Sequence, residues 1–412
     1  MSITVRTVEV EDLPAYVDMS AGAFLERPPA LDSIAATLAE AWDLSRVYAA
    51  FDGPRIVGSF RSFATELTVP GGRQVQAAGV AGVGVAATHR RRGVLRRMTE
   101  TEHAAMRERG DVVGLLHASE YAIYGRFGYG MGCRQAIWRL DTNATTFVDH
   151  DDPGSIEFLT ADADAITVAK AVFETWRHRQ VGEIRRRDIV WEFQFGVRHD
   201  GWGDPWRGFV AIHRAPTGAV DGYVRYHTES QWTDGQTRSI VHVDDLHALT
   251  VDASVALWRF LADIDWVAHV RAERRSPSER LPWHLTNPRA AVLVEQADGM
   301  FVRLHDVARA LEARTYAGEG SLVLEVIDPE TPGGRQRVAL EAGPDGARAR
   351  STDQSPDLTV HASAIGAAYL GGSPLSLAAI ATGGADEGRP GALAEGERLF
   401  RTLDEPWSST FF

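Results

Sequence analysis

The chain has 412 residues, of which 44% are hydrophobic and 24% are charged, and its formal net charge is −13. These proportions are those of a globular protein and exclude a mainly disordered or fibrous chain, and the length suggests two to four domains. The negative net charge argues against nonspecific binding to nucleic acid or to an anionic membrane surface. The single cysteine, Cys133, excludes an internal disulfide and any site built from several cysteines.

No stretch of the sequence approaches 18 uninterrupted apolar residues, so we expect no transmembrane helix. The first 13 residues alternate charged and β-branched side chains and lack the apolar core of a signal peptide. We therefore expect a cytoplasmic protein that does not bind membranes.

The N-terminal part of the chain is typical of an α/β unit. Alternating apolar residues predict strands, helical spacing predicts a helix over 11–24, and Gly110 predicts the end of a second helix near Arg109. The predicted strands cover 3–6, 47–52, 55–67, 74–85 and 112–118.

Two further units follow. The second contains helices predicted at 163–178 and 253–263 and strands at 208–213, 222–227, 238–246 and 266–271. The third begins with an amphipathic helix predicted over 302–315. It continues with strands at 321–327, 335–340 and 358–363 and helical pieces at 364–370 and 375–382. The chain ends on two aromatic residues, Phe411 and Phe412, which indicates a terminus that is docked rather than frayed.

The segment from Val80 to Met98 carries the strongest chemical signal. It is typical of a strand, a short turn and a helix, with Arg90 and Gly93 where the helix begins. The first backbone N–H groups of a helix lack intrahelical partners, and the helix dipole adds positive charge there, so a pyrophosphate fits this position. The alternative is a solvated basic helix face, which is the usual fate of a run of arginines.

Other interpretations of the sequence are weaker. The chain has no G-x-x-x-x-G-K-[ST], G-x-G-x-x-G, H-E-x-x-H or G-x-S-x-G pattern. His242, Asp244 and Asp245 are a candidate metal corner. On an alternating strand, however, only His242 and Asp244 share a face, with no third ligand evident, so we favour a structural role. Cys133 lacks an evident histidine partner, so a buried structural thiol is favoured over a nucleophile.

The strand followed by Arg90-Arg91-Arg92-Gly93-Val94-Leu95 resembles the acetyl-CoA signature of the GNAT superfamily of N-acetyltransferases, [RQ]-x-x-G-x-[GA], with Leu95 in place of the small last residue. One branch of the GNAT superfamily shares this departure from the signature at its last position. Thr88-His89-Arg90-Arg91-Arg92-Gly93, Ala118-Ser119-Glu120 and Ile123-Tyr124-Gly125-Arg126-Phe127-Gly128-Tyr129-Gly130 resemble the enhanced intracellular survival (Eis) acetyltransferases. Further similarities near residues 257–261, 281–283, 298–304 and 313–316 extend the resemblance over nearly the whole chain.

The resemblance implies an α/β (α+β) fold. Two GNAT domains in tandem, each with a mixed central sheet flanked by helices, would come first. The first would span 1–150 and carry the acetyl-CoA site, and the second, a degenerate GNAT domain, would span 151–295. A sterol-carrier-protein-like α+β domain at 296–412 would end in the active site. It also implies acetyl-CoA as co-substrate, no metal, and a homo-oligomer, expected to be a homohexamer.

The resemblance assigns roles to individual residues. Tyr124 would be the general acid that protonates the departing thiolate, and the C-terminal carboxylate of Phe412 would be the general base. The cofactor-binding residues would be Val83, Gly84 and Val85 along the pantetheine arm, Ser119 near it, and Arg90, Arg91, Gly93, Val94 and Leu95 around the pyrophosphate.

The expected reaction is direct acetyl transfer, in a ternary complex, to a primary amine of an aminoglycoside, a polyamine, or a lysine-like small molecule or peptide. Glu26, Asp32 and Glu405 are the candidate residues for binding the ammonium group. Two alternatives stay open: a catalytically inert scaffold that binds coenzyme A, and a lipid or sterol carrier that acts through the C-terminal domain.

Overall fold

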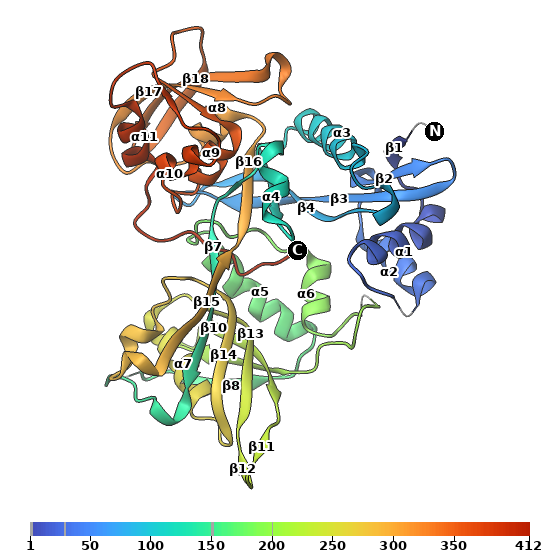
Figure 1. Ribbon diagram of the computed structural model, residues 1–412. Helices are drawn as coiled ribbons and strands as arrows, with labels where there is room; N and C mark the ends of the chain where they lie inside the picture. The colour runs from blue at the N-terminus through green and yellow to red at the C-terminus, as the bar shows by residue number, and fades with distance from the viewer. Residues whose placement is uncertain (1–2, 29, 150–151, 200) are drawn as a thin grey trace.

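The computed structural model describes residues 3–28, 30–149, 152–199 and 201–412. Three units built on separate sheets follow one another (Figure 1). Among the described residues, no helix is long and apolar enough to cross a bilayer.

The first unit is a seven-stranded sheet with the strand order β1-β2-β3-β4-β5-β16-β6. Its strands are β1 (Thr4–Thr7), β2 (Val47–Asp52), β3 (Arg55–Thr68), β4 (Gln74–Val85), β5 (Val113–His117), β6 (Gly130–Met131) and β16 (Met300–Leu304); its helices are α1 (Leu13–Ala23), α2 (Leu31–Ala41), α3 (Val94–Arg109) and α4 (Tyr121–Tyr124). Neighbouring residues on β3 face opposite sides: Gly58 packs under Met98 of α3, while the Ser59 hydroxyl lies 3.4 Å from that of Ser20 on α1. Helices α1 and α3 therefore cover opposite faces of the sheet.

Strand β16 corrects one sequence-based expectation. The predicted helix over 302–315 is wrong for its first residues, because the structure forms β16 up to Leu304 and a shorter helix, α8 (Val307–Glu312). Every residue of β16 is buried, and the strand pairs antiparallel with β5 and β6. A strand buried on both faces gives a continuous apolar run, which spacing alone does not distinguish from a helix.

The second unit is a seven-stranded sheet with the order β15-β7-β14-β13-β10-β9-β8. Its strands are β7 (Arg134–Asp141), β8 (Ser155–Leu159), β9 (Phe209–Arg214), β10 (Val220–Glu229), β13 (Ser239–Ala248), β14 (Val267–Arg275) and β15 (Ala291–Asp298); β11 (Trp232–Thr233) and β12 (Gln236–Thr237) form a small hairpin, and the helices are α5 (Ala163–Arg177), α6 (Asp188–Gln194) and α7 (Val251–Ala262). Strand β7 precedes residue 150 but pairs with β14 and β15. The first two units thus exchange strands: β7 enters the second sheet and β16 returns to the first.

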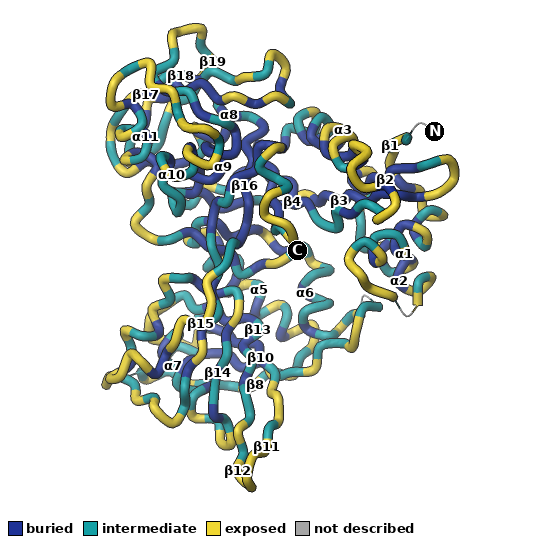
Figure 2. The backbone as a smooth tube through the Cα atoms, viewed as in Figure 1, coloured by how far each residue is buried: buried dark blue, intermediate teal, exposed yellow. Residues whose placement is uncertain are grey.

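The third unit is a five-stranded sheet with the order β19-β18-β17-β20-β21. Its elements are β17 (Gly320–Ile327), β18 (Arg335–Gly343), β19 (Gly346–Ser351), β20 (Leu358–His361), β21 (Asp386–Glu387), α8, α9 (Ala362–Ala368), α10 (Leu375–Ile380) and α11 (Ala392–Phe400). One apolar cluster runs from its Leu324 and Ile365 to Leu67 and Val302 of the first sheet. Figure 2 shows this buried backbone passing between the two units, so they share a core.

The last residues of the chain are held by buried charges of the second unit. Arg186 donates to both carboxylate oxygens of Asp245, to the Ser409 hydroxyl (2.8 Å) and to the Thr410 hydroxyl (2.9 Å). Glu183 accepts from the backbone N–H (2.8 Å) and hydroxyl (2.7 Å) of Ser409. Burial alone would lower the pKa of Arg186, but the charge of Asp245 raises it above its ordinary value. The expected docked terminus is therefore fixed by ionic hydrogen bonds at 408–410.

Aromatic contacts extend this anchor. The Trp407 ring lies against Trp176, 5.5 Å between centroids, and beneath the guanidinium of Arg275 at 5.2 Å. Gly182 has φ +93°, and a Cβ there would meet the Trp407 backbone at 3.1 Å. The close approach of the two backbones therefore requires glycine at this position.

Replacing Arg186 with Met should lower the free energy of unfolding by about 3–5 kcal/mol, because it leaves the buried Asp245 carboxylate without its cation. Urea denaturation measures this loss. Arg185→Met is the matched control, since Arg185 is exposed and should change stability by no more than about 0.5 kcal/mol. A loss below about 1 kcal/mol for Arg186→Met would contradict the anchoring role.

Candidate active site

Strands β4 and β5 separate where the first sheet opens toward the C-terminus of the chain. They pair in parallel from Ala77 with Val113 to Val80 with Leu116. Strand β4 continues to Val85, but over these last residues its only ladder partner in the described part of the chain is β3. The edge of β4 from 81 to 85 that faces away from β3 therefore has backbone groups free for an extended ligand.

A β-bulge lies within this open edge. Ser59 is opposite Gly84 and Arg61 is opposite Ala81, so two residues of β4 face a single residue of β3. Gly82 has φ +59°, a left-handed conformation that favours glycine. The Ser59 hydroxyl donates to the Gly82 carbonyl at 2.8 Å. The bulge re-aims the backbone of β4 beside the opening.

Helix α3 begins directly after this edge. Its N-cap, Gly93, has φ +75° and supplies no side-chain hydrogen bond, so the first-turn N–H groups are available to an anion. Arg90, Arg91 and Arg92 are exposed, and within the described chain none of them forms an ion pair. The arginines and the helix start together can hold a pyrophosphate.

The turn before α3 is fixed by a buried histidine. His89 is 7% exposed; its Nδ1 lies 2.8 Å from the Thr88 hydroxyl and its Nε2 lies 3.2 Å from the Asp52 carboxylate. These contacts tie the turn to the end of β2. The predicted anion-binding segment is thereby held in place before any ligand binds.

Tyr124 ends the short helix α4, which follows β5. Its ring packs edge-on against Tyr129, 6.1 Å between centroids. Burial, with a smaller effect from Glu120, raises the pKa of Tyr124 to about 12, so the phenol is protonated at neutral pH. Ser119 is exposed in the loop between β5 and α4.

Phe412 lies at the end of β5. Its ring contacts Phe63 at 5.0 Å and His117 at 4.8 Å between centroids, and the His117 Nε2–H donates to the Thr410 carbonyl at 3.3 Å. Figure 1 shows the C-terminus at the lower end of α4, between α4 and α6. The structure thus brings the last residue, Tyr124 and the open edge of β4 to one region of the first unit.

The residues expected to bind an ammonium group are placed differently. Glu26 follows α1 and Asp32 lies in the first turn of α2, and both are exposed. Glu405 accepts from the Ser278 hydroxyl at 2.9 Å and lies 3.8 Å from Arg134. None of the three lines the cavity beside the open edge.

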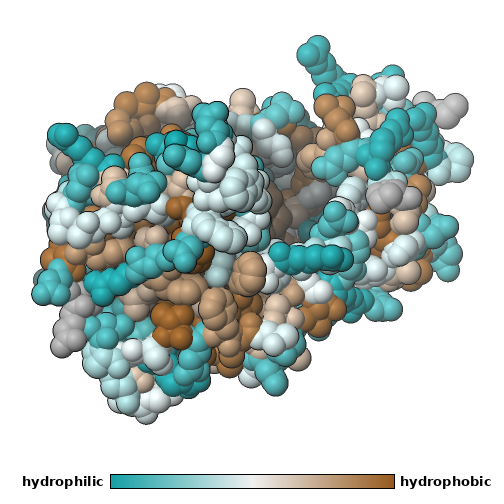
Figure 3. All heavy atoms as spheres, turned by 90° about the horizontal axis from the view of Figure 1, so that it is seen from below, coloured by the Kyte–Doolittle hydropathy of each residue, from teal (hydrophilic) through white to brown (hydrophobic). Residues whose placement is uncertain are grey.

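That cavity, of about 150 Å³, lies between α1, α2, β3, the β4 bulge and a loop of the second unit. It is lined by Tyr16, Val17, Ser20, Leu38, Trp42, Arg61, Gly82 and Trp202. Figure 3, which views the molecule from below, shows a hollow between the body of the protein and the part that carries α1 and α2. Sequence reasoning pointed to Gly82 as a lining position and missed the other residues; their one signal was an arginine, Arg61, in the middle of a predicted strand.

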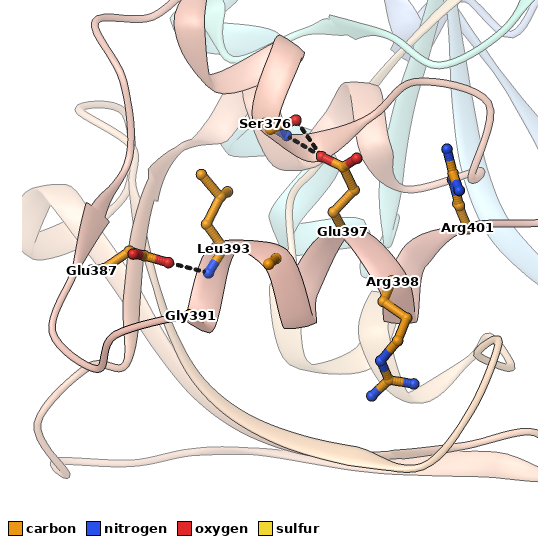
Figure 4. A pocket seen from close by; sticks show the side chains of 8 residues that line it. Ser376, Glu387, Gly391, Leu393, Glu397, Arg398 and Arg401 are labelled. Atoms are coloured by element: carbon orange, nitrogen blue, oxygen red, sulfur yellow. Dashed lines mark hydrogen bonds between the residues drawn. The ribbon is translucent and has the colours of Figure 1, made fainter.

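A larger groove of about 530 Å³ lies along α10 and α11 in the third unit (Figure 4). Its polar groups bind one another: Glu397 accepts from the backbone N–H and hydroxyl of Ser376, and Glu387 accepts from the Leu393 N–H. Charged side chains, not an apolar tunnel, form much of its lining. The groove is remote from the β4–β5 opening and is not the candidate active site.

The other candidate groups have structural roles. Asp245 pairs with Arg186, His242 with Glu229, and Asp244 accepts from the Trp206 indole N–H at 2.8 Å. No group of metal-ligating side chains that could hold an ion is present among the described residues. Cys133 is buried, as expected, and burial raises its pKa to about 12, which disfavours the thiolate that a nucleophile needs.

Comparison with known proteins decides the family. Residues 4–132 and 182–304 each match a model of the acetyltransferase (GNAT) domain, and residues 307–409 match the sterol carrier protein domain. A Streptomyces griseus protein named "uncharacterized N-acetyltransferase" is 38% identical over 100% of both chains. The N-acetyltransferase Eis of Mycobacterium tuberculosis is 32% identical over 92% of each. The chain belongs to the Eis family of GNAT N-acetyltransferases.

A solved Eis-family structure agrees with this assignment. Eis1 from Mycobacterium abscessus has a TM-score of 0.85 and 31% identity over 99% of this chain and 100% of that one. The predicted fold class, two GNAT domains followed by a sterol-carrier-like domain, is confirmed, and so is the prediction of an N-acetyltransferase. GNAT acetyltransferases use acetyl-CoA in general.

The stability of the site should depend on pH through His117. Burial lowers the pKa of His117 to about 4 in the folded chain, against about 6.5 when unfolded. Below pH 6.5 the unfolded chain therefore binds a proton that the folded chain does not. The free energy of unfolding consequently decreases as the pH falls from 6.5 toward 4. Urea denaturation of His117→Asn across this window should show a shallower pH slope, by up to about 1.4 kcal/mol per pH unit. Identical slopes would contradict a neutral buried His117.

Proposed function

We propose that this protein transfers the acetyl group of acetyl-CoA to a primary amine by direct attack in a ternary complex. The observation that carries the proposal is the open edge of β4, which ends at the glycine-capped, arginine-rich start of α3. A pantetheine arm fits an open strand edge, and a pyrophosphate fits a helix start with free N–H groups. Tyr124 and the chain terminus adjoin this edge.

Binding of acetyl-CoA is assigned to the residues expected from the sequence. The backbone of Val83, Gly84 and Val85 pairs with the pantetheine arm. The first turn of α3, at Gly93, Val94 and Leu95, receives the pyrophosphate together with the guanidinium groups of Arg90 and Arg91. Ser119 lies at the thioester end. Bound acetyl-CoA supplies an activated acetyl group for the attacking amine.

The chain's own residues move two protons. The Phe412 carboxylate accepts a proton from the attacking amine. A backbone N–H of the Val83–Val85 segment stabilises the oxyanion. Tyr124 then donates its proton to the leaving thiolate. The same burial that raises the pKa of Tyr124 also makes a thiolate more basic, so the donor and acceptor stay matched.

The acceptor classes are those expected of the family: an aminoglycoside, a polyamine or a lysine-like amine. An inert scaffold is disfavoured because Tyr124 and the open edge of β4 are both present. A lipid carrier is disfavoured because the groove in the third unit is lined by charged groups. A cytoplasmic, homohexameric enzyme stays our prediction; the exposed apolar residues 292–294 on the edge strand β15 support self-association.

Tyr124→Phe should reduce kcat for thiol release from acetyl-CoA by about 10²–10⁴-fold, because it removes the proton donor. The KM for acetyl-CoA should change little, since the ring and its packing remain. A thiol-release assay with kanamycin, neomycin, spermidine, histamine and a lysine peptide as acceptors provides the measurement.

The matched control is Tyr121→Phe, because Tyr121 lies on the same helix and is 58% exposed. It should retain the unsubstituted protein's kcat. An active Tyr124→Phe variant would remove Tyr124 from the mechanism. No thiol release with any amine, despite binding of acetyl-CoA, would favour the inert scaffold.

A further inference from the structure

Arg61 is a cation in the cavity beside the β4 bulge, and it has no counter-ion among the described residues. It projects from the face of β3 that α1 covers, and its guanidinium lies 4.7 Å from the Trp42 ring centroid and 5.5 Å from that of Phe63. Its Nη1 is buried and makes no hydrogen bond, and no carboxylate of the described chain pairs with it. A buried guanidinium with an unused donor is costly unless an acceptor arrives from outside.

A second guanidinium adjoins the first. Arg187 lies 4.9 Å from the same Phe63 ring, donates only to the Ala41 carbonyl (3.1 Å) within the described chain, and leaves its buried Nε unused. Burial, and next the charge of Arg187, lowers the pKa of Arg61 to about 10. Two uncompensated positive charges thus stand together in a protein whose net charge is −13.

A further donor lines the cavity beside Arg61. The Tyr16 side chain is 1% exposed, lines the cavity, and its hydroxyl has no hydrogen-bond partner in the described chain. The polar groups without partners, Tyr16 Oη and Arg61 Nη1, can both donate. Buried donors without acceptors are the complement of an acidic group.

The cavity is connected to the reacting centre. It is lined by Gly82 of the bulge, next to the open edge of β4. The Phe63 ring that both arginines contact also touches the Phe412 ring. An acceptor held at Arg61 therefore lies within reach of the terminal residue.

We propose that Arg61, assisted by Arg187 and Tyr16, binds an acidic group of the acceptor, so that the enzyme acetylates amines that also carry a carboxylate or a phosphate. This inference rests on the proposed function and selects its substrate class. Amino acids and phosphorylated amines fit these donors. Among the acceptor classes proposed above, the site therefore selects the lysine-like amines, which can carry a carboxylate, over polyamines and aminoglycosides, which the two guanidinium groups would repel.

The test uses pairs of acceptors that differ by an acidic group: L-phenylalanine and 2-phenylethylamine, L-lysine and cadaverine, phosphoethanolamine and ethanolamine. Thiol release should favour the acidic member of at least one pair by tenfold or more in kcat/KM, and the three pairs distinguish a carboxylate from a phosphate. Arg61→Gln and Arg187→Gln should abolish that preference and spare the plain amines. Arg185→Gln, which removes an exposed arginine from the same segment, should keep it.

Two results would overturn the proposal. One is a preference for the plain amine in every pair, or no preference. The other is an equal loss on both members of a pair in Arg61→Gln, because that result would make Arg61 a support for the terminal carboxylate and not a receptor for the acceptor.

A binding measurement separates this proposal from the proposed function. Calorimetric titration with inorganic phosphate, at saturating coenzyme A to block the α3 site, should show binding that Arg61→Gln loses at least tenfold. Arg61-dependent phosphate binding without turnover of any amine would reject acetyl transfer and keep the acid-binding site. Turnover of an amine, with phosphate binding that does not depend on Arg61, would keep acetyl transfer and reject the acid-binding site.

Discussion

The buried ion pair between Arg186 and Asp245 is the interaction on which the site depends. It spans the turn before α6 and strand β13, and Arg186 uses its remaining donors on Ser409 and Thr410. A carboxyl terminus fixed two residues away has little freedom, so Phe412 reaches the end of β5 as a defined group. In the proposed mechanism, the third unit would therefore contribute a group to the first unit through a segment anchored on the second.

The second constraint is that strand β4 extends beyond the last residue that pairs with β5. Where β5 ends and β4 continues, the backbone keeps donors and acceptors that the fold does not use, and the Gly82 bulge sets their direction. The acyl donor is expected along this edge and the acceptor in the cavity on the α1 side. The terminal residue contacts Phe63 and the end of β5, so its anchoring determines where its carboxylate lies relative to both sites.

Much of this could be predicted from the sequence. Local signals sufficed to locate the strand–turn–helix segment of β4 and α3, because glycine and arginine at a strand–helix junction have a direct physical meaning. The role of Tyr124 stays a prediction that rests on the resemblance of its motif. Strand exchange was missed, because the apolar run at 300–304 suits a helix as well as a buried strand. The cavity was missed because Arg61, Tyr16 and Trp42 are brought together only by tertiary packing. Glu26 and Asp32 were chosen for charge, and the fold leaves both exposed.

The most direct test of the central claim extends the chain by a few residues beyond Phe412. The extension moves the carboxylate away while the anchor at 408–410 stays intact. We expect the extended protein to retain binding of acetyl-CoA and thermal stability and to lose acetyl transfer. Full turnover by the extended protein would contradict it and remove the chain terminus from the mechanism.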